Sequence, residues 1–266
     1  MDRLFEVFQA HNIRYFFYAG GNDSQDTTNK IHQEAIRRGW DMRCIGIPKT
    51  IDNDLPHTDH CNGYGSVIKY NATTVMEVAF DVSSMATDDG SCCIIEVMGR
   101  AAGWIAAGTV LAKRLPSDAP HIILLPEVPF EEAKFLAKVK ETVGYAQRAA
   151  AHFASETDVD EAAACGEAAV RAAVGGKSGY MVKIVRTGNR PYTWTTDVQS
   201  LDDIANVEHF LPRDLITEDG FLANEKFIEY AAPLVEGHLH LPMEGGLPKF
   251  VVLEKSPVEK KLAPRA

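Results

Sequence analysis

Residues 48–54, Pro-Lys-Thr-Ile-Asp-Asn-Asp, combine one cation and two carboxylates in a short loop after an apolar segment. A hydroxyl group that attacks phosphorus needs a base to accept its proton and a cation to balance charge on the transferred group. Lys49, Asp52 and Asp54 have the residue types and the spacing that this chemistry requires. The same residues also suit a polar surface turn, because Asn and Asp form local hydrogen bonds in turns. The loop by itself leaves both interpretations open.

A second polar loop, Gly-Gly-Asn-Asp-Ser at residues 20–24, follows an aromatic, β-rich segment at 13–19. Paired glycines let backbone N–H groups approach an anion closely, and the N-terminus of a following helix adds partial positive charge. Asp23 would repel a phosphate unless a metal ion lay between them. Gly-Gly alone is common after strands for steric reasons, but two such loops after successive strands are much more specific. Together they indicate a site for a phosphorylated ligand.

Short apolar segments alternate with amphipathic ones along the chain. The sequence predicts strands near 13–19, 43–47, 92–97, 121–125 and 250–253, and a hairpin formed by 180–186 and 191–197. It predicts helices near 3–11, 25–38, 66–80, 101–113, 131–143, 159–174, 201–210 and 224–236. Such alternation implies an α/β fold with a mostly parallel sheet and helices on both faces. Ligands of these sheets bind beyond the carboxyl ends of the strands, which is where both loops fall.

Composition narrows the class of protein and of partner. The chain has 266 residues, is 45% hydrophobic, and carries a formal net charge of −10, which argues against a nucleic-acid partner. No apolar stretch is long enough to span a membrane, and no signal peptide is recognised. Five cysteines without CxxC spacing favour reduced thiols and a cytoplasmic location. An anionic substrate would be held by a few cations, for which the candidates are Lys49, Lys69, Arg100 and Arg148.

The two loops and two later motifs resemble the phosphofructokinase family, and within it the pyrophosphate-dependent branch. The later motifs are Glu-Val-Met-Gly-Arg at 96–100, followed by Ala-Gly-Trp at 102–104, and Pro-Glu at 126–127. The similarity runs from about Leu4 to about Leu253, with the four motifs in the family's order. It implies a phosphofructokinase-like fold and phosphoryl transfer to fructose 6-phosphate, giving fructose 1,6-bisphosphate in glycolysis.

The resemblance implies a role for each matching residue. Asp52 is the general base for the 1-hydroxyl of the sugar, and Lys49 assists catalysis by neutralising the leaving group. The implied substrate-binding residues are Thr50, Asp54, Met98, Gly99, Arg100, Glu127, Tyr145 and Arg148, the last two as a Tyr-x-x-Arg pair that grips the 6-phosphate. The implied donor-binding residues are Gly20, Gly21, Asp23 and Ser24, and Asn22 and Asp23 are the implied ligands of Mg²⁺.

Two positions bear on the identity of the phosphoryl donor. Relatives that use ATP carry glycine at the positions of Asp23 and Lys49. A carboxylate at position 23 would crowd and repel the α-phosphate of a nucleotide, whereas an ammonium at position 49 can neutralise the leaving group released by pyrophosphate. Asp23 and Lys49 together therefore favour pyrophosphate as the phosphoryl donor. The second interpretation is an enzyme that uses ATP as the donor. A reaction with pyrophosphate would run near equilibrium in either direction.

The chain also departs from the family pattern. The family's first strand and Gly-rich donor loop have no counterpart before Tyr15, relatives insert a further strand and helix before Tyr145, and Ser91 stands where Lys or Arg is expected. A third interpretation is therefore a fragment, a faulty gene model or a degenerate paralogue that keeps the fold without catalysis. The expected organisation is a donor-site and catalytic α/β region at 1–130 and a partial second α/β region with C-terminal helices and a tail at 131–266. A homodimer is expected, because the family builds its sugar site across two subunits.

Overall fold

The structure, a computed structural model, describes residues 1–85, 93–115, 118–139, 155–238, 243–244, 247–248 and 258–262. The predictions for Ser91, Tyr145, Arg148 and the strand near 250–253 lie outside the described residues. The helices are α1 (Asp2–Ala10), α2 (Asn22–Arg37), α3 (Tyr64–Met85), α4 (Trp104–Gly108), α5 (Glu132–Val139), α6 (Glu156–Val174) and α7 (Glu225–Ala231). Short 3-10 helices are η1 (Thr109–Ala112), η3 (Leu201–Asp203), η4 (Arg213–Leu215) and η5 (Ala232–Val235). Among the helices in these ranges, none has the length and apolar character needed to cross a membrane.

A four-stranded sheet with the order β1-β2-β3-β4 forms the centre of the molecule. Its strands are β1 (Tyr15–Gly20), β2 (Arg43–Pro48), β3 (Tyr180–Asn189) and β4 (Tyr192–Ser200), and a separate pair joins β5 (Met243–Glu244) to β6 (Leu247–Pro248). β1 and β2 are parallel, β2 and β3 are parallel, and β3 and β4 form an antiparallel hairpin. The register of the first pair sets Gly20 opposite Pro48, so the two predicted ligand loops leave the same edge of the sheet.

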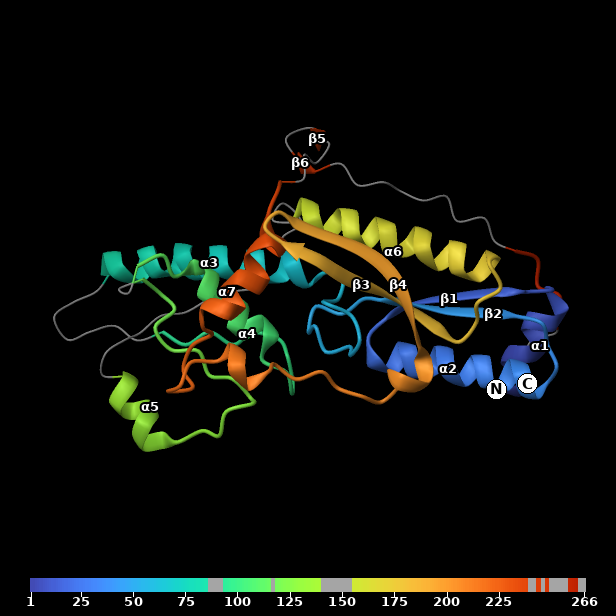
Figure 1. The fold of residues 1–266 in the computed structure, drawn as a ribbon, viewed down its shortest axis with the longest axis horizontal. Coiled ribbons are helices and arrows are strands. Elements are labelled where there is room, and N and C mark those ends of the chain that lie inside the picture. Colours follow the sequence, from blue (N-terminus) through green and yellow to red (C-terminus); the bar gives the residue numbers. More distant parts are fainter. Residues whose placement is uncertain are drawn as a thin grey trace.

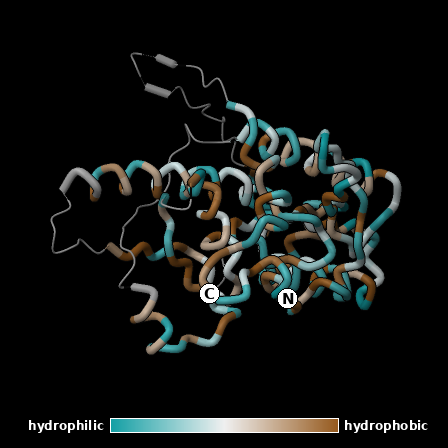
Figure 2. Tube along the Cα trace, turned by 60° about the vertical axis from the view of Figure 1, so that its left-hand side comes forward, coloured by the Kyte–Doolittle hydropathy of each residue, from teal (hydrophilic) through white to brown (hydrophobic). Residues whose placement is uncertain are grey.

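Helices cover both faces of this sheet, with α6 on one face and α2 on the other (Figure 1). Cys165 and Ala169 of α6 pack against Ile45 of β2, and Ile31 of α2 packs in a second cluster with Phe5 of α1. Hydrophilic and hydrophobic residues alternate along the coiled parts of the trace, as in helices that bury one face (Figure 2). The predicted α/β fold with a mostly parallel, doubly covered sheet is confirmed.

Two predicted strands are not present in the part of the chain that the structure describes. Residues 93–97 and 121–125 belong to no strand. Ile123 and Leu125 instead pack around Trp104 in a core cluster built largely from helices. Ile123 and Leu125 are therefore buried by helix packing, whereas Ile94 and Leu124 are exposed. A strand forms only where another strand pairs with the segment.

The predicted helix at 201–210 is also wrong beyond its first turn. It stops after η3, and Asn206 adopts a φ of 62°, a left-handed conformation that ends a helix and that asparagine tolerates. The predicted boundary near residue 130 stays a prediction, although the four-stranded sheet takes β1 and β2 from one side of it and β3 and β4 from the other.

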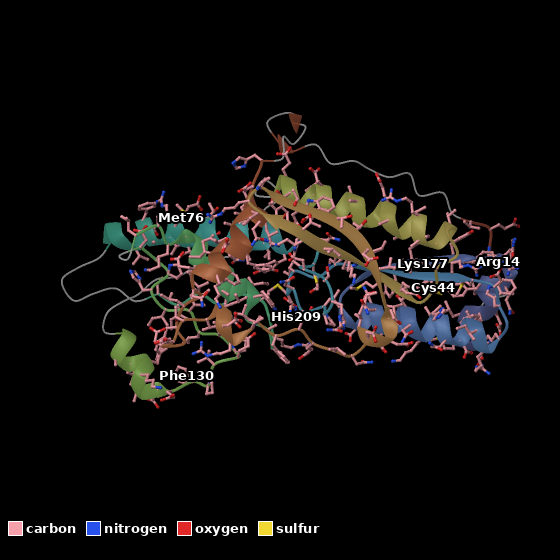
Figure 3. The ribbon with its side chains drawn as sticks, in the orientation of Figure 1. Arg14, Cys44, Met76, Phe130, Lys177 and His209 are labelled. Atoms are coloured by element: carbon pink, nitrogen blue, oxygen red, sulfur yellow. The ribbon has the colours of Figure 1, made fainter. Side chains whose placement is uncertain are left out.

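Helices α3, α4 and α7 form a second group beyond the carboxyl ends of β1 and β2 (Figure 1). Their cluster surrounds Trp104, whose indole N–H donates to the carbonyl of His209 at 2.9 Å. The rings of Trp104 and His209 lie 5.2 Å apart. Figure 3 shows His209 near the middle of the molecule, between the sheet and these helices. The segment after β4 therefore connects the strand ends with the helical cluster.

A buried ionic network fastens the loop after β2 to α6 and to the hairpin. His60 contacts Oδ2 of Asp59 through Nδ1 at 2.7 Å and Oε2 of Glu161 through Nε2 at 2.6 Å. The side chains of His60 and Glu161 have no exposed surface. Arg186 donates to both oxygens of Asp59 at 3.0 and 3.1 Å, and the hydroxyl of Tyr192 donates to Glu161 at 2.5 Å. Two carboxylates thus face two cationic side chains.

Both nitrogens of the His60 ring face a carboxylate, so both carry a proton and the ring is an imidazolium. Burial by itself lowers the pKa of His60, but the hydrogen bonds and negative charges of Asp59 and Glu161 outweigh it and raise the pKa to about 9. The charge of the imidazolium and that of Arg186 compensate the two buried carboxylates, which would otherwise be costly to bury.

This raised pKa predicts that folding stability falls above neutral pH. The pKa of His60 in the folded protein, about 9, exceeds the ordinary value of 6.5, so its stabilisation is complete below pH 6.5 and is lost as the pH rises through 9. The shift corresponds to roughly 3 kcal/mol. Urea unfolding between about pH 6 and about pH 9.5 measures it, with His60→Gln combined with Glu161→Gln as the comparison, because His60→Gln alone would leave Glu161 as an unpaired buried charge. The free energy of unfolding should fall more steeply with pH in the wild type than in the double variant, since both keep the buried thiols of Cys44, Cys61 and Cys165, whose raised pKa also lowers stability at high pH; equal slopes would contradict the assignment.

Candidate active site

The loops after β1 and β2 run side by side at the carboxyl edge of the sheet. The amide N–H of Lys49 donates to the carbonyl of Gly20 at 3.3 Å, which continues the strand pairing beyond β2. Further out, the side-chain amide of Asn22 donates to the carbonyl of Asp54 at 3.4 Å. These two hydrogen bonds join the two predicted motifs into one structural unit.

Gln25 of α2, which no motif marked, fastens both loops from inside. It has no exposed surface, and its Nε2 donates to the carbonyls of Gly20 at 2.7 Å and Ile47 at 3.1 Å. Gly46 makes room for it, because a Cβ at that position would lie 1.9 Å from Oε1 of Gln25. A glycine within an otherwise apolar strand often signals such a close approach, and it was the one sequence signal that could have pointed here.

The start of α2 is open to an anion. Gly21 is the N-cap residue and provides no side chain to satisfy the first N–H groups of the helix. Gly20 has to be small, because a Cβ there would lie 2.1 Å from the hydroxyl oxygen of Ser24. Asp23 is exposed in the first helical turn. The predicted donor-binding residues thus surround a helix N-terminus, where a phosphate is favoured.

The loop at 48–54 is held in one conformation by its own polar residues. The hydroxyl of Thr50 accepts from the amide N–H of Asp52 at 3.2 Å, and the side-chain amide of Asn62 donates to the carbonyl of Pro48 at 2.9 Å. Asn53 is 1% exposed and has a φ of 56°, which asparagine tolerates better than most residues. The turn at Asn53 separates the two predicted catalytic-site carboxylates, Asp52 and Asp54.

Several buried oxygens at this site have no hydrogen-bond partner within the described residues. Those that belong to predicted site residues are Asn22 Oδ1, Asp52 Oδ1, Asp54 Oδ1 and Glu127 Oε2. The other two unpaired side-chain atoms in the described part are Gln25 Oε1 and Asn62 Oδ1, from residues that hold the loops. Since buried polar atoms nearly always have partners, this concentration of unpaired acceptors is typical of a ligand site.

The electrostatic surroundings of Asp52 bring two motifs together, the loop at 48–54 and the motif at 96–100. Burial raises its pKa, Asp54 raises it further, and Arg100 and Lys49 oppose this rise, with a raised pKa as the result. Lys49 and Arg100 therefore lie within electrostatic reach of Asp52, although they come from different motifs. A carboxylate with a raised pKa binds a proton more strongly, which suits a general base.

Glu127 is oriented by two backbone donors. Its Oε1 accepts from the N–H groups of Gly103 at 2.8 Å and Leu211 at 2.9 Å, which leaves Oε2 unpaired. The same segment supplies the N–H of His209, which donates to the carbonyl of Asp54 at 3.0 Å. Residues 209–211, at the end of a predicted helix, therefore couple Glu127 to the loop at 48–54. The sequence carried no signal for this role.

Gly99 and Glu127 line one cavity of about 720 Å³, together with Lys134, Arg213 and Phe221 among others. Gly99 has a φ of 114°, and a Cβ there would lie 2.7 Å from the carbonyl oxygen of Ala102, so this turn requires glycine. Met98 is half exposed. The structure thus brings the third and fourth motifs together at one cavity, whose lining does not include residues of the loops at 20–24 and 48–54.

Comparison with known proteins agrees with this geometry. The phosphofructokinase family profile matches residues 1–189. A pyrophosphate–fructose 6-phosphate 1-phosphotransferase from Halomonas elongata is 40% identical over 321 aligned residues, covering 98% of this chain and 77% of that relative. A protein of the same name from Methylococcus capsulatus is 39% identical over 322 residues, with the same coverage. The crystal structure of a pyrophosphate-dependent phosphofructokinase from Marinobacter aquaeolei gives a TM-score of 0.92 at 41% identity, covering 98% of this chain and 78% of that one.

The fold and the site define an α/β protein with a carboxylate-rich ligand site at the carboxyl edge of its sheet. The chain belongs to the phosphofructokinase family. The expected resemblance to the pyrophosphate-dependent branch is confirmed by the relatives that carry this name. The alignment with the Halomonas elongata relative is longer than the 266 residues of this chain, so the relative contains residues without a counterpart here.

The contact between Gly46 and Gln25 predicts a specific sensitivity to a single methyl group. Gly46→Ala should lower the free energy of unfolding by about 1–3 kcal/mol, because the new Cβ displaces a buried side chain that bonds both loops. Gly166→Ala in α6 is the matched control, since a Cβ there meets nothing within 4 Å. That variant should be stabilised by up to about 1 kcal/mol. Urea unfolding of both proteins decides the point, and equal stabilities would show that Gln25 has room to move.

Proposed function

We propose that this chain transfers a phosphoryl group from pyrophosphate to the 1-hydroxyl of fructose 6-phosphate. The observation that carries the proposal is Asp52, which has a raised pKa, an unpaired buried oxygen, and two cations within electrostatic reach. Relatives at 40% and 39% identity are named for this reaction, and each aligns with 98% of the chain. Their agreement with the site chemistry supports the substrate pair.

In the proposed step, Asp52 accepts the proton of the 1-hydroxyl while the sugar oxygen forms a bond to phosphorus. The bridging P–O bond of pyrophosphate breaks, and inorganic phosphate leaves with the electron pair. Lys49 and Arg100 balance negative charge on the transferred and leaving groups. In the reverse direction the protonated Asp52 returns its proton to the sugar oxygen, so one residue serves both directions.

The sugar is proposed to lie between the two halves of the site. Thr50 and Asp54 hold the reacting end, and Oε2 of Glu127, unpaired and fixed through Oε1, accepts hydrogen bonds from sugar hydroxyls. Met98, Gly99 and Arg100 line the sugar-phosphate pocket. Tyr145 and Arg148 are proposed to grip the 6-phosphate and complete the set of substrate-binding residues.

A magnesium ion is proposed at the donor side of this site, where the candidate ligands include an amide oxygen, since the described residues contain no group of three or more His, Cys, Asp or Glu side chains that could hold a metal ion. Oδ1 of Asn22 and Oδ1 of Asp54 are buried and unpaired, and the residues are linked by a hydrogen bond. Hard oxygen atoms of this kind are the ligands that Mg²⁺ prefers. Asn22 and Asp54 would hold the ion. Asp23, the other metal ligand expected from the sequence, would provide a further carboxylate from the first turn of α2. The ion would neutralise the charge of pyrophosphate.

The donor is proposed to be pyrophosphate rather than ATP. Asp23 stands at the helix start where an incoming phosphate would be bound, and Lys49 lies within electrostatic reach of Asp52, the proposed base. A carboxylate there repels a nucleotide phosphate that no metal shields. ATP as donor and a non-catalytic paralogue remain the competing hypotheses. The buried free thiols of Cys44, Cys61 and Cys165 support the further proposal of a cytoplasmic protein, and a homodimer remains part of the proposal.

The assignment of Asp52 predicts a large loss of turnover without loss of binding. Asp52→Asn keeps the shape of the side chain and removes the proton acceptor, so kcat should fall by about 10²–10⁴ while KM for fructose 6-phosphate changes little. The control is Asp41→Asn, an exposed carboxylate at the opposite edge of the sheet. Both are assayed by fructose 1,6-bisphosphate formation with pyrophosphate and Mg²⁺. Normal turnover in Asp52→Asn would exclude Asp52, whereas a wild-type chain that binds the sugar without turnover would favour the paralogue.

The donor assignment predicts opposite effects on two assays. Lys49→Gly should lower kcat with pyrophosphate by about 10-fold or more, because its charge is needed most as the leaving group forms. Asp23→Gly combined with Lys49→Gly should weaken the use of pyrophosphate further and permit some turnover with ATP. The three proteins are compared with both donors at saturating fructose 6-phosphate. Unchanged pyrophosphate turnover in Lys49→Gly would remove this residue from the mechanism.

A further inference from the structure

Asn53 links the loop at residues 48–54, here called the catalytic loop because it carries the proposed base Asp52, to the protein interior. Its Oδ1 accepts from the amide N–H of Cys61 at 2.8 Å, and its Nδ2 donates to the hydroxyl of Tyr230 at 3.2 Å. Because Asn53 stands between Asp52 and Asp54 in a left-handed turn, its position sets the direction in which both neighbouring residues leave the turn. Any group that holds Cys61 or Tyr230 therefore acts on the catalytic loop.

Both partners of Asn53 lead to the ionic network around His60. Tyr230 donates from its hydroxyl to the carbonyl of Asp59 at 2.9 Å, and Cys61 directly follows His60 in the chain. The guanidinium of Arg186 donates to the carbonyl of Tyr230 at 3.0 Å and also binds the carboxylate of Asp59. Two short routes thus connect the imidazolium to Asn53, one through the backbone and one through Tyr230.

Helix α6 is the rigid support for this network. Glu161 and Asp158 lie one turn apart on its buried face, with 0% and 5% of their surface exposed. Glu161 holds His60, and Asp158 accepts from the N–H groups of Gly63 at 2.8 Å and Ser66 at 3.2 Å. The carboxylates of α6 therefore fix both the segment before α3 and the first turn of α3.

We propose that His60 is a positioning residue for phosphoryl transfer, acting from outside the site. Its imidazolium, gripped by Asp59 and Glu161, places Asn53 and thereby directs Asp52 and Asp54 toward the ligands. The inference rests on the proposed function only in the role that Asp52 plays. It gives a reason why the carboxylates of Asp59 and Glu161 and the ring of His60 are paired in the protein interior. A structural role alone would require only that the polar groups be paired.

Substitutions at His60 and at its partner Glu161 separate the positioning role of His60 from its contribution to folding stability. His60→Gln leaves Glu161 as an uncompensated buried charge, whereas the double variant His60→Gln with Glu161→Gln places two neutral amides together and should regain stability. Displacement of a reacting group by about 1 Å can cost about 10²-fold in rate. Both proteins should therefore lose kcat by about 10–10²-fold, with KM for fructose 6-phosphate within about threefold of wild type.

Met42→Ala supplies a control for loss of stability alone, since Met42 is buried in the separate cluster beneath α1. It should unfold more easily and keep its kcat. Thermal unfolding, kcat and KM are measured for all four proteins. If kcat recovers together with stability in the double variant, or if kcat falls equally in Met42→Ala, His60 has only a structural role and the proposal is overturned.

A measurement that does not depend on turnover distinguishes failure of the proposed function from failure of the positioning role of His60. The side-chain amide resonances of Asn53 in ¹⁵N-labelled protein report the position of the loop whether or not the chain is catalytically active. They should shift in His60→Gln and in the double variant and stay in place in Met42→Ala. If the wild type shows no turnover, the proposed function fails while shifted resonances still support the positioning role. Unshifted resonances in His60→Gln overturn it.

Discussion

The parallel pairing of β1 with β2 is the constraint on which the rest of the site depends. It places Gly20 beside Pro48, and every later contact between the two loops follows from this register. A slip of one residue would turn each side chain of the strand to the other face and separate Asn22 from Asp54. Gln25 reinforces the register, because one buried amide reaches a carbonyl on each strand. Catalysis and strand pairing are therefore not independent in this fold.

Electrostatics explains how a chain with a net charge of −10 can bind phosphorylated ligands. Carboxylates concentrate at the site itself, and the compensating charges of the described residues there are few and local, Lys49 and Arg100. The magnesium ion proposed at Asn22, Asp23 and Asp54 would add to them. Deeper in the protein the opposite arrangement occurs, since Asp59 and Glu161 are matched by His60 and Arg186. The charged groups of this network are paired with one another, whereas acceptors of Asn22, Asp52 and Asp54 at the sheet edge have no partner among the described residues. The net charge of the chain therefore predicts the local balance of charges neither at the site nor in the buried network.

Local patterns anticipated most of the elements but not all of them. The strand–loop–helix unit around residues 15–37 could be predicted because the turn chemistry and the helix start depend on adjacent residues. The segments at 93–97 and 121–125 could not, because an apolar run becomes a strand only if another strand lies beside it. Local patterns could not predict the role of residues 209–211 either. The backbone N–H groups of this segment donate to Asp54 and Glu127, which lie far away in the sequence.

The sequence by itself determined which residues could do the chemistry: the proposed base, the cations, the glycines of the proposed anion loop and the glutamate proposed to contact the sugar all stand in recognisable motifs. Only the tertiary structure decided how these residues are held. Gln25 and His60 carry no motif, and their importance comes from partners that folding provides, such as Glu161, which lies 101 positions from His60. The physical reason is that a residue's type is a local property. Its burial, its charge state and its hydrogen-bond partners depend on distant segments that only the folded chain brings together.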